Sequence, residues 1–108
     1  ELAEGKSPEE EAEPILRACK GRILALAVEG REYTSESFAE TLKTLCDRGE
    51  EITFVIGSSC GLSPRVKRAA DGLVSFSRMT FPHQLMRVVL CEQIYRAFMI
   101  TAGAEYHK

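Results

Sequence analysis

Two uninterrupted apolar runs constrain the fold of this 108-residue chain more than any other feature. Residues 22–28 read RILALAV, and residues 52–56 read ITFVI. A strand with one face in solvent alternates apolar and polar residues, whereas continuous apolar runs are typical of strands buried on both faces of a parallel sheet. A shorter run, residues 73–76, follows the same pattern. The sequence therefore predicts a parallel sheet with flanking helices.

Helix start and stop signals lie between these runs. Ser63 before Pro64 is typical of an N-cap and a first helical residue, and Ser7 before Pro8 repeats that pattern. Strands that alternate with helices make an α/β domain. The expected helices run from Pro8 to Gly21, kinked or divided into two short pieces at Pro14; over residues 36–48 between a cap at Thr34 and Ser35 and an end at Gly49; over residues 64–71 with an end at Gly72; and beyond Pro82.

Length and composition predict one globular domain over residues 1–108, with a flexible end at residues 1–10. No apolar run approaches the length of a membrane span, and the acidic N-terminal stretch lacks the apolar segment of a secretory signal. We therefore expect a cytoplasmic protein with no membrane partner. The chain begins with Glu1 rather than Met, so a fragment, a processed form and a trimmed chain are all open.

The cysteines and charges narrow the possible partners. Four widely spaced cysteines form no CxxC pair, so we expect free thiols and no metal site.

Residues 1–51 carry 7 basic and 13 acidic side chains, whereas residues 52–108 carry 7 basic and 3 acidic ones. A basic half suits an anionic partner such as RNA. The alternative is that the acidic excess only marks a solvated N-terminal helix.

The segment from Ser75 to Met99 organises the rest of the chain. Phe81-Pro82 breaks a strand-like start, because a proline biases the residue before it away from helix. A long helix is expected to follow, with a buried stripe at helical spacing formed by Leu85, Val88, Val89, Ile94, Ala97 and Phe98. Its polar residues are expected to converge on a pocket; they are His83, Gln84, Arg87, Glu92, Gln93, Tyr95 and Arg96.

Three loops are expected at the carboxyl ends of the strands, where open α/β sheets bind their ligands. They are residues 29–32, 57–61 and 77–82. Glycines in the second loop would let the backbone approach a ligand closely. The loop matches neither the GxxxxGK[ST] nor the GxGxxG pattern, so a plain structural turn remains the alternative for each loop taken alone.

The same C-terminal segment carries a resemblance. The string S-x-S-x-x-T-x-P-H-x-L-x-R-V-x-x-x-E-x-x-Y-R-A, with the ending Tyr106-His107-Lys108, closely resembles the RlmH (YbeA-like) family over roughly residues 11–108. These are SPOUT-class RNA methyltransferases with a C-terminal trefoil knot. They use S-adenosylmethionine (SAM) to methylate the imide nitrogen of a pseudouridine in large-subunit ribosomal RNA. The family's first strand and first helix have no counterpart here.

The resemblance implies a site and its residues. In the family, SAM sits bent in a cleft made by three knot loops. Carried over, the cofactor-binding residues are Leu26, Gly57, Ser58, Gly61, Phe76, Ser77, Arg78, Met79, Thr80, Phe81 and Pro82. The second loop departs from the family's G-G-P-E-G and reads Gly57-Ser58-Ser59-Cys60-Gly61, and Ala27 stands where the family carries an aspartate.

Methylation of an imide nitrogen requires in-line alignment, exclusion of water and removal of a proton. By resemblance, the catalytic residues are His83, Arg87, Glu92, Tyr106 and His107, and the RNA-binding residues are Arg96 and Lys108. Arg87, Arg96 and Lys108 would contact phosphates or the cofactor carboxylate. The alternatives are an Arg–Glu92 ion pair that steadies the helix, and a disordered polar tail.

The resemblance also implies a homodimer through the long helix, with ribosomal RNA in the ribosome as the substrate. The first functional hypothesis is therefore a SAM-dependent rRNA methyltransferase. The alternative is a catalytically weak or inactive knotted relative that serves as an RNA-binding or interaction module, because the second loop is altered and the N-terminal portion of the family is missing.

Overall fold

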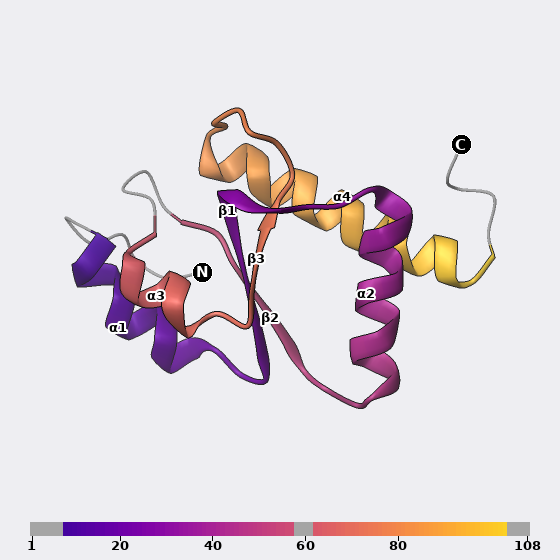
Figure 1. The fold of residues 1–108 in the computed structure, drawn as a ribbon, viewed down its shortest axis with the longest axis horizontal. Helices are drawn as coiled ribbons and strands as arrows, with labels where there is room; N and C mark the ends of the chain where they lie inside the picture. Colours follow the sequence, from indigo (N-terminus) through magenta and orange to yellow (C-terminus); the bar gives the residue numbers. More distant parts are fainter. Residues whose placement is uncertain (1–7, 58–61, 104–108) are drawn as a thin grey trace.

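In the computed structural model, which describes residues 8–57 and 62–103, the three apolar runs become adjacent strands. The strands are β1 (Arg22–Glu32), β2 (Ile52–Val55) and β3 (Gly72–Ser75). The helices are α1 (Pro8–Ala18), α2 (Ser35–Asp47), α3 (Pro64–Ala69) and α4 (His83–Thr101). Figure 1 shows the sheet between two pairs of helices, α1 with α3 and α2 with α4.

The sheet is parallel and has the strand order β2-β1-β3, so β1 lies in the middle. Ala25 of β1 pairs with Val55 on one side and with Leu73 on the other. Parallel neighbours require crossover connections, which α2 and α3 with their loops provide. The predicted α/β class and the parallel sheet with flanking helices are confirmed.

Both faces of β1 are buried, as the continuous apolar run predicts. Successive side chains of a strand point to opposite faces. Leu24 and Leu26 accordingly pack against α2 and α4, whereas Ala25 faces α1 and α3 and has no exposed surface. The first cluster is completed by Phe38, Ala39, Leu42, Val74, Leu90 and Ala97, and the second by Ala12, Val55 and Val66.

Helix α2 begins and ends where its local signals place it. The Thr34 hydroxyl accepts a hydrogen bond from the Ser37 amide at 3.0 Å, and the Ser37 hydroxyl accepts one from the Thr34 amide at 2.9 Å. This reciprocal pair is a capping box. After the C-cap, Gly49 has φ +74°, the left-handed conformation that glycine adopts without strain.

Helix α1 does not divide into two pieces at Pro14, because it runs unbroken from Pro8 to Ala18 with Pro14 inside it. A proline inside a helix removes one hydrogen bond and crowds the preceding turn. Here Pro14 is exposed, whereas Ala12 on the opposite side is almost completely buried against α3 and the sheet. The Glu13 carboxylate also accepts a hydrogen bond from Arg65 of α3 at 2.6 Å. Packing and this ion pair hold the helix together.

The turn expected at residues 29–32 is instead part of β1. The pairing with β3 shifts register between Leu26 and Arg31, since both residues are partners of Val74. The residues between them leave the regular ladder and then rejoin β3. Gly30 permits this, because a Cβ at that position would lie 2.6 Å from the carbonyl carbon of Leu73 and 2.8 Å from the amide nitrogen of Val74.

The third helix is shorter than predicted, and Gly72 begins β3 rather than ending α3. Helix α3 ends before Asp71 because Asp71 is hydrogen-bonded to β1 instead. Its amide donates to the Ile23 carbonyl at 2.7 Å, and its carboxylate accepts from the Ile23 amide at 2.7 Å. Arg22 joins this group, with its guanidinium 3.1 Å from Glu50 and 3.4 Å from Asp71. These contacts tie the amino ends of the strands together.

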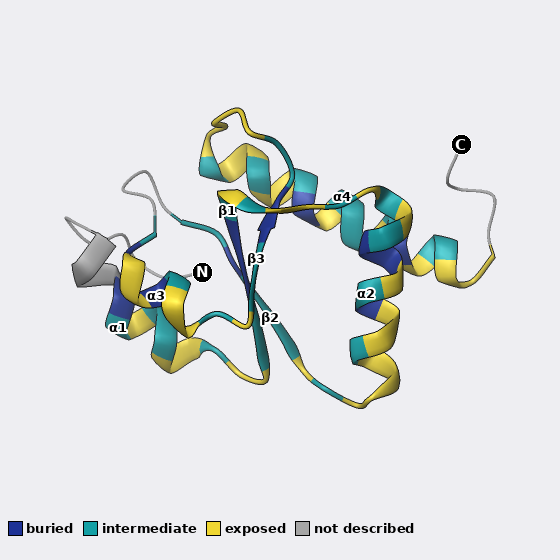
Figure 2. Ribbon diagram, viewed as in Figure 1, coloured by how far each residue is buried: buried dark blue, intermediate teal, exposed yellow. Residues whose placement is uncertain are grey.

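The buried stripe predicted for α4 is wrong for three of its residues. Leu85, Val88 and Phe98 are exposed by 46, 64 and 53%. The side of α4 that packs on the core consists of Leu90 and Ala97, with Met86, Ile94 and Ile100 beside them. Helix α4 therefore carries a second, outward apolar stripe, and Figure 2 shows exposed residues in yellow at intervals along this helix.

The described part of the chain contains neither a membrane-spanning helix nor a metal-binding cluster. None of its helices is both long and apolar enough to cross a membrane. It also contains no group of three or more His, Cys, Asp or Glu side chains that could hold a metal ion.

We predict that Gly30→Ala lowers the free energy of unfolding by about 1–3 kcal/mol, because the added methyl group meets backbone atoms of β3 that have no room to move. Urea denaturation followed by circular dichroism measures this loss. Gly72→Ala is the matched control in the same sheet, since its Cβ would meet only the flexible Cδ2 of Leu24 at 3.2 Å. Equal losses in the two variants would contradict the close approach at Gly30.

Candidate functional site

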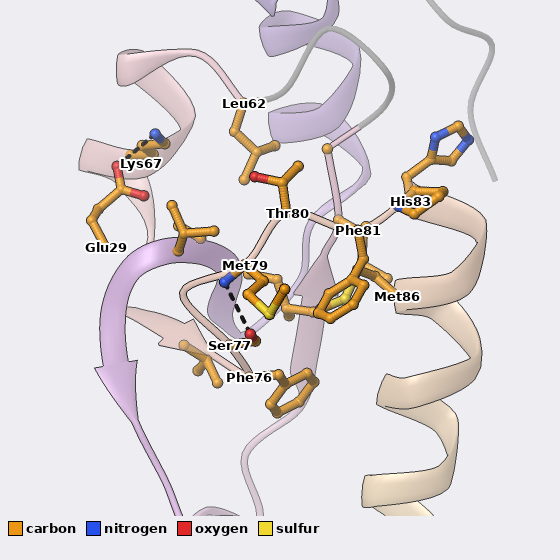
Figure 3. Close-up of a pocket in the computed structure, with 17 residues that line it drawn as sticks. Glu29, Leu62, Lys67, Phe76, Ser77, Met79, Thr80, Phe81, His83 and Met86 are labelled. Carbon is orange, nitrogen blue, oxygen red and sulfur yellow. Dashed lines mark hydrogen bonds and ion pairs between the residues drawn. The ribbon is translucent and has the colours of Figure 1, made fainter.

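A cavity of about 770 Å³ lies at the carboxyl ends of the three strands (Figure 3). This volume is within the roughly 300–1,000 Å³ of typical small-molecule sites. Its lining comes from β1 (Leu26, Ala27, Val28 and Glu29), from the end of β2 and the start of α3 (Ile56, Gly57, Leu62 and Lys67), and from β3 through the first turn of α4 (Val74, Phe76, Ser77, Met79, Thr80, Phe81, Pro82, His83 and Met86).

The segment between β3 and α4 is shaped by its own serines. The Ser75 hydroxyl donates to the Ser77 carbonyl at 3.0 Å. The Ser77 hydroxyl accepts from the Met79 amide at 2.9 Å, an interaction drawn in Figure 3. Pro82 then serves as the N-cap of α4, and its carbonyl accepts from the Met86 amide at 3.0 Å. The segment therefore bends around the cavity before the helix begins.

Apolar side chains dominate the walls, and some of them are unusually exposed. Met79 is 70% exposed, Val28 46% and Phe81 38%, and all three line the cavity. Phe76 is fixed from behind by Phe38, whose ring centroid lies 5.6 Å away at an interplanar angle of 82°. Exposed apolar groups around a concave site are typical of a surface that a ligand covers.

One ion pair lies at the edge of this apolar cavity. The Lys67 ammonium is 2.8 Å from a Glu29 carboxylate oxygen, and Figure 3 shows the two side chains together on the side away from His83. The hydrogen bond from Lys67 is the main cause that lowers the pKa of Glu29 below its ordinary value. Glu29 is therefore ionised at neutral pH.

The structure places nine of the residues singled out by sequence in the lining of this one cavity. They are Leu26, Gly57, Phe76, Ser77, Met79, Thr80, Phe81, Pro82 and His83. Arg78 does not line it, and its guanidinium lies 3.0 Å from Glu32 instead. Ser58, Gly61, Tyr106, His107 and Lys108 lie outside the described residues.

The polar residues of α4 do not converge on the cavity as expected, because only His83 of that set lines it. Glu92 and Arg96 form an ion pair within the helix at 2.6 Å, which is the arrangement held open as the alternative. Gln93 accepts a hydrogen bond from the Ser35 hydroxyl at 2.9 Å and so joins α4 to α2. Successive positions of a helix point in different directions, so the other polar side chains of α4 do not face the cavity as His83 does.

Sequence reasoning missed several lining residues. Glu29 lay inside one of the three expected loops, but its partner Lys67 was read only as part of a helix. Lys67 lies one turn after the helix start at Ser63-Pro64. That start is at the edge of the sheet where the three loops were expected, so the sequence could have indicated Lys67 as a lining residue. In the sequence, Ile56, Leu62 and Met86 could not be distinguished from ordinary core residues.

Comparisons with known proteins identify the family. A family model described as "Predicted SPOUT methyltransferase" matches residues 1–107. The chain belongs to the SPOUT methyltransferase family. This match confirms the resemblance stated from the C-terminal motif.

Similar proteins include several called "Ribosomal RNA large subunit methyltransferase H". The one from Streptococcus thermophilus is 59% identical over 87 residues, covering 80% of this chain and 55% of that protein. The one from Streptococcus uberis is 47% identical over all of this chain and 77% of that protein. The one from Ligilactobacillus salivarius is 55% identical, with 93 and 65% covered. The chain thus spans about half the length of the first of these SPOUT relatives.

We predict that Ser77→Ala loosens the segment that borders the cavity, because the Met79 amide loses its acceptor. The expected cost of about 1 kcal/mol corresponds to roughly fivefold faster hydrogen exchange at that amide, measured by NMR. Thr44→Ala is the control: it also deletes a side-chain hydrogen bond, but on the outer side of α2. Unchanged exchange at Met79 in the Ser77 variant would show that the serine does not order this segment.

Proposed function

We propose that this chain is the SAM-binding part of a methyltransferase that acts on large-subunit ribosomal RNA in the cytoplasm, with a pseudouridine as the target. The observation that carries the proposal is the apolar cavity at the carboxyl ends of the strands. Its walls come from three segments that the family resemblance assigns to SAM. The names of the relatives support the class of substrate.

The residues of the cavity fit this cofactor. Exposed Met79 and Phe81 offer apolar surface for an adenine ring, and Gly57 keeps the backbone open to a ligand. We assign Leu26, Gly57 and the lining residues of the segment 76–82, which exclude Arg78, to holding SAM. When bound, SAM supplies a methyl group that its sulfonium has already activated for transfer.

The chain's own contribution is alignment and exclusion of water. The walls of the cavity keep bulk water from one side of a bound ligand, and the bend at Pro82 sets His83 on its rim. Among the catalytic residues implied by the resemblance, His83 lies in the lining, so it is our first candidate for the group that accepts the imide proton. Tyr106 and His107 remain candidates by resemblance alone.

Homodimer formation and the trefoil knot belong to the same proposal. The outward stripe of α4 is apolar at Leu85, Val88, Tyr95 and Phe98, with Tyr95 exposed by 51%. These positions recur at helical spacing, as a helix that packs against a second copy requires. The family resemblance implies a dimer through this helix. It also implies that the C-terminal segment is knotted, and that Arg87, Arg96 and Lys108 contact phosphates or the cofactor carboxylate.

We predict that the chain binds S-adenosylhomocysteine with micromolar affinity in a calorimetric titration, because adenosine can fill the apolar cavity. Ser77→Trp should abolish binding, since the indole would occupy the bend of the bordering segment. Thr44→Trp, an exposed position on α2, should leave binding unchanged. A folded chain that fails to bind at millimolar ligand would favour an inactive RNA-binding relative. If binding is seen, methylation of intact ribosomes is the next assay.

We predict that the chain is a dimer in sedimentation velocity experiments and that Val88→Glu converts it to a monomer. Val88 is 64% exposed in the single chain, so the charge leaves the monomer fold intact but would be buried unpaired in the interface. Thr44→Glu adds the same charge on the outer side of α2 and should remain dimeric. A dimeric Val88→Glu variant would rule out the outward stripe as the interface.

A further inference from the structure

The Glu29–Lys67 ion pair is an unusual feature for the edge of an apolar cavity. Surface ion pairs contribute little to stability, typically about 0–1 kcal/mol. The α1–α3 contact already has its own pair, Arg65 with Glu13 at 2.6 Å, so a further one is not needed to hold α3. A ligand that carries both charges would give the pair a role in binding.

Both residues are held in place by the fold. Glu29 belongs to the stretch of β1 that shifts register against β3, next to Gly30, whose backbone lies on Leu73 and Val74. Lys67 follows Val66, which is completely buried in the cluster between α1, α3 and the sheet. The Lys67 side chain is only 30% exposed. The two charges therefore cost little to position when a ligand binds.

The rest of the described lining offers no comparable charge at that edge. Ser77 uses its hydroxyl to accept from the Met79 amide. His83 lies on the other side of the cavity, at the start of α4 (Figure 3). Met79, Phe81 and Phe76 supply apolar wall between them. The cavity therefore has an apolar body and one zwitterionic edge.

SAM also combines an apolar part with a zwitterionic end, so it matches the cavity. Its adenosine part is a flat ring with a sugar, and its other end is an α-amino acid with one ammonium and one carboxylate. Resting on the proposed function, we propose that Lys67 binds the carboxylate of the cofactor's amino-acid end and that Glu29 binds its ammonium. The ion pair between the two side chains is then exchanged for two pairs with the ligand. Charge-assisted hydrogen bonds of this kind are the strong ones.

This assignment separates the amino-acid end from the adenosine end, and two available ligands test it. S-adenosylhomocysteine carries both ends, whereas 5′-methylthioadenosine carries the adenosine end without the amino acid. The experiment is calorimetric titration of the whole chain with each ligand. The variants are Lys67→Met and Glu29→Gln, each checked for its fold by circular dichroism. Lys43→Met, which removes the Lys43–Asp47 pair on α2, is the matched control.

We expect Lys67→Met to weaken S-adenosylhomocysteine about tenfold or more, because one charge-assisted bond is lost and Glu29 is left facing the ligand carboxylate. Glu29→Gln should weaken it less. Binding of 5′-methylthioadenosine should change by less than about twofold in both variants, and Lys43→Met should change neither ligand.

Equal losses for the two ligands, or no loss for S-adenosylhomocysteine, would overturn the assignment while leaving the cofactor site intact. A wild-type chain that binds neither ligand would refute the cofactor site itself and this assignment with it. The Glu29→Gln variant keeps the test decisive if Lys67→Met does not fold, because the amide has nearly the same shape as the carboxylate.

Discussion

Burial of β1 on both faces is the constraint on which the rest of the structure depends. The strand is central in the sheet, so its register fixes where β2 and β3 end. Ala25 is small and completely buried, which lets the short helix α3 and α1 lie close on that side. Leu24 and Leu26 fill the opposite layer under α2 and α4. The carboxyl ends of the strands therefore open at one edge, and the cavity forms there.

The cavity combines features that oppose stability. Met79 and Phe81 keep apolar surface in water, and the Glu29–Lys67 pair sets charges beside that surface. A fold selected for stability alone would cover the apolar groups, because exposed apolar surface costs free energy, and it would gain little from a partly exposed ion pair. Their concentration at the end of the sheet where α/β domains bind ligands is the strongest physical argument for a binding site here.

The sequence was sufficient for the sheet and for most helix ends, because those depend on neighbours in the chain. The continuous runs, the Thr34 cap and Gly49 are local signals, and each is realised. Asp71 and Gly30 behaved differently from expectation because distant backbone decides their conformations: Ile23 binds Asp71, and Leu73 lies against Gly30. Local propensity contains no information about such contacts.

The same reason explains what was missed in the candidate site. Glu29 and Lys67 are 38 residues apart in the sequence, and only the folded chain brings them together. The inward side of α4 was also misjudged, because this helix has apolar residues on two sides and periodicity alone does not say which one meets the sheet. Once Leu90 and Ala97 are seen to pack on β1 and α2, Leu85, Val88 and Phe98 must point outward.

Helix α4 connects the cavity to the outward stripe. Its first turn, at His83 and Met86, is a wall of the cavity, and the same continuous helix carries the outward stripe as far as Phe98. Between His83 and Phe98 the helix contains neither proline nor glycine, the usual sites of kinks, so a tilt or slide imposed at the stripe would be carried to the wall. If a second copy packs on the stripe, as proposed, its association would be coupled to binding of the proposed ligand, and by thermodynamic linkage the ligand would affect that association in return. Protein concentration would then act on this pocket as an effector does.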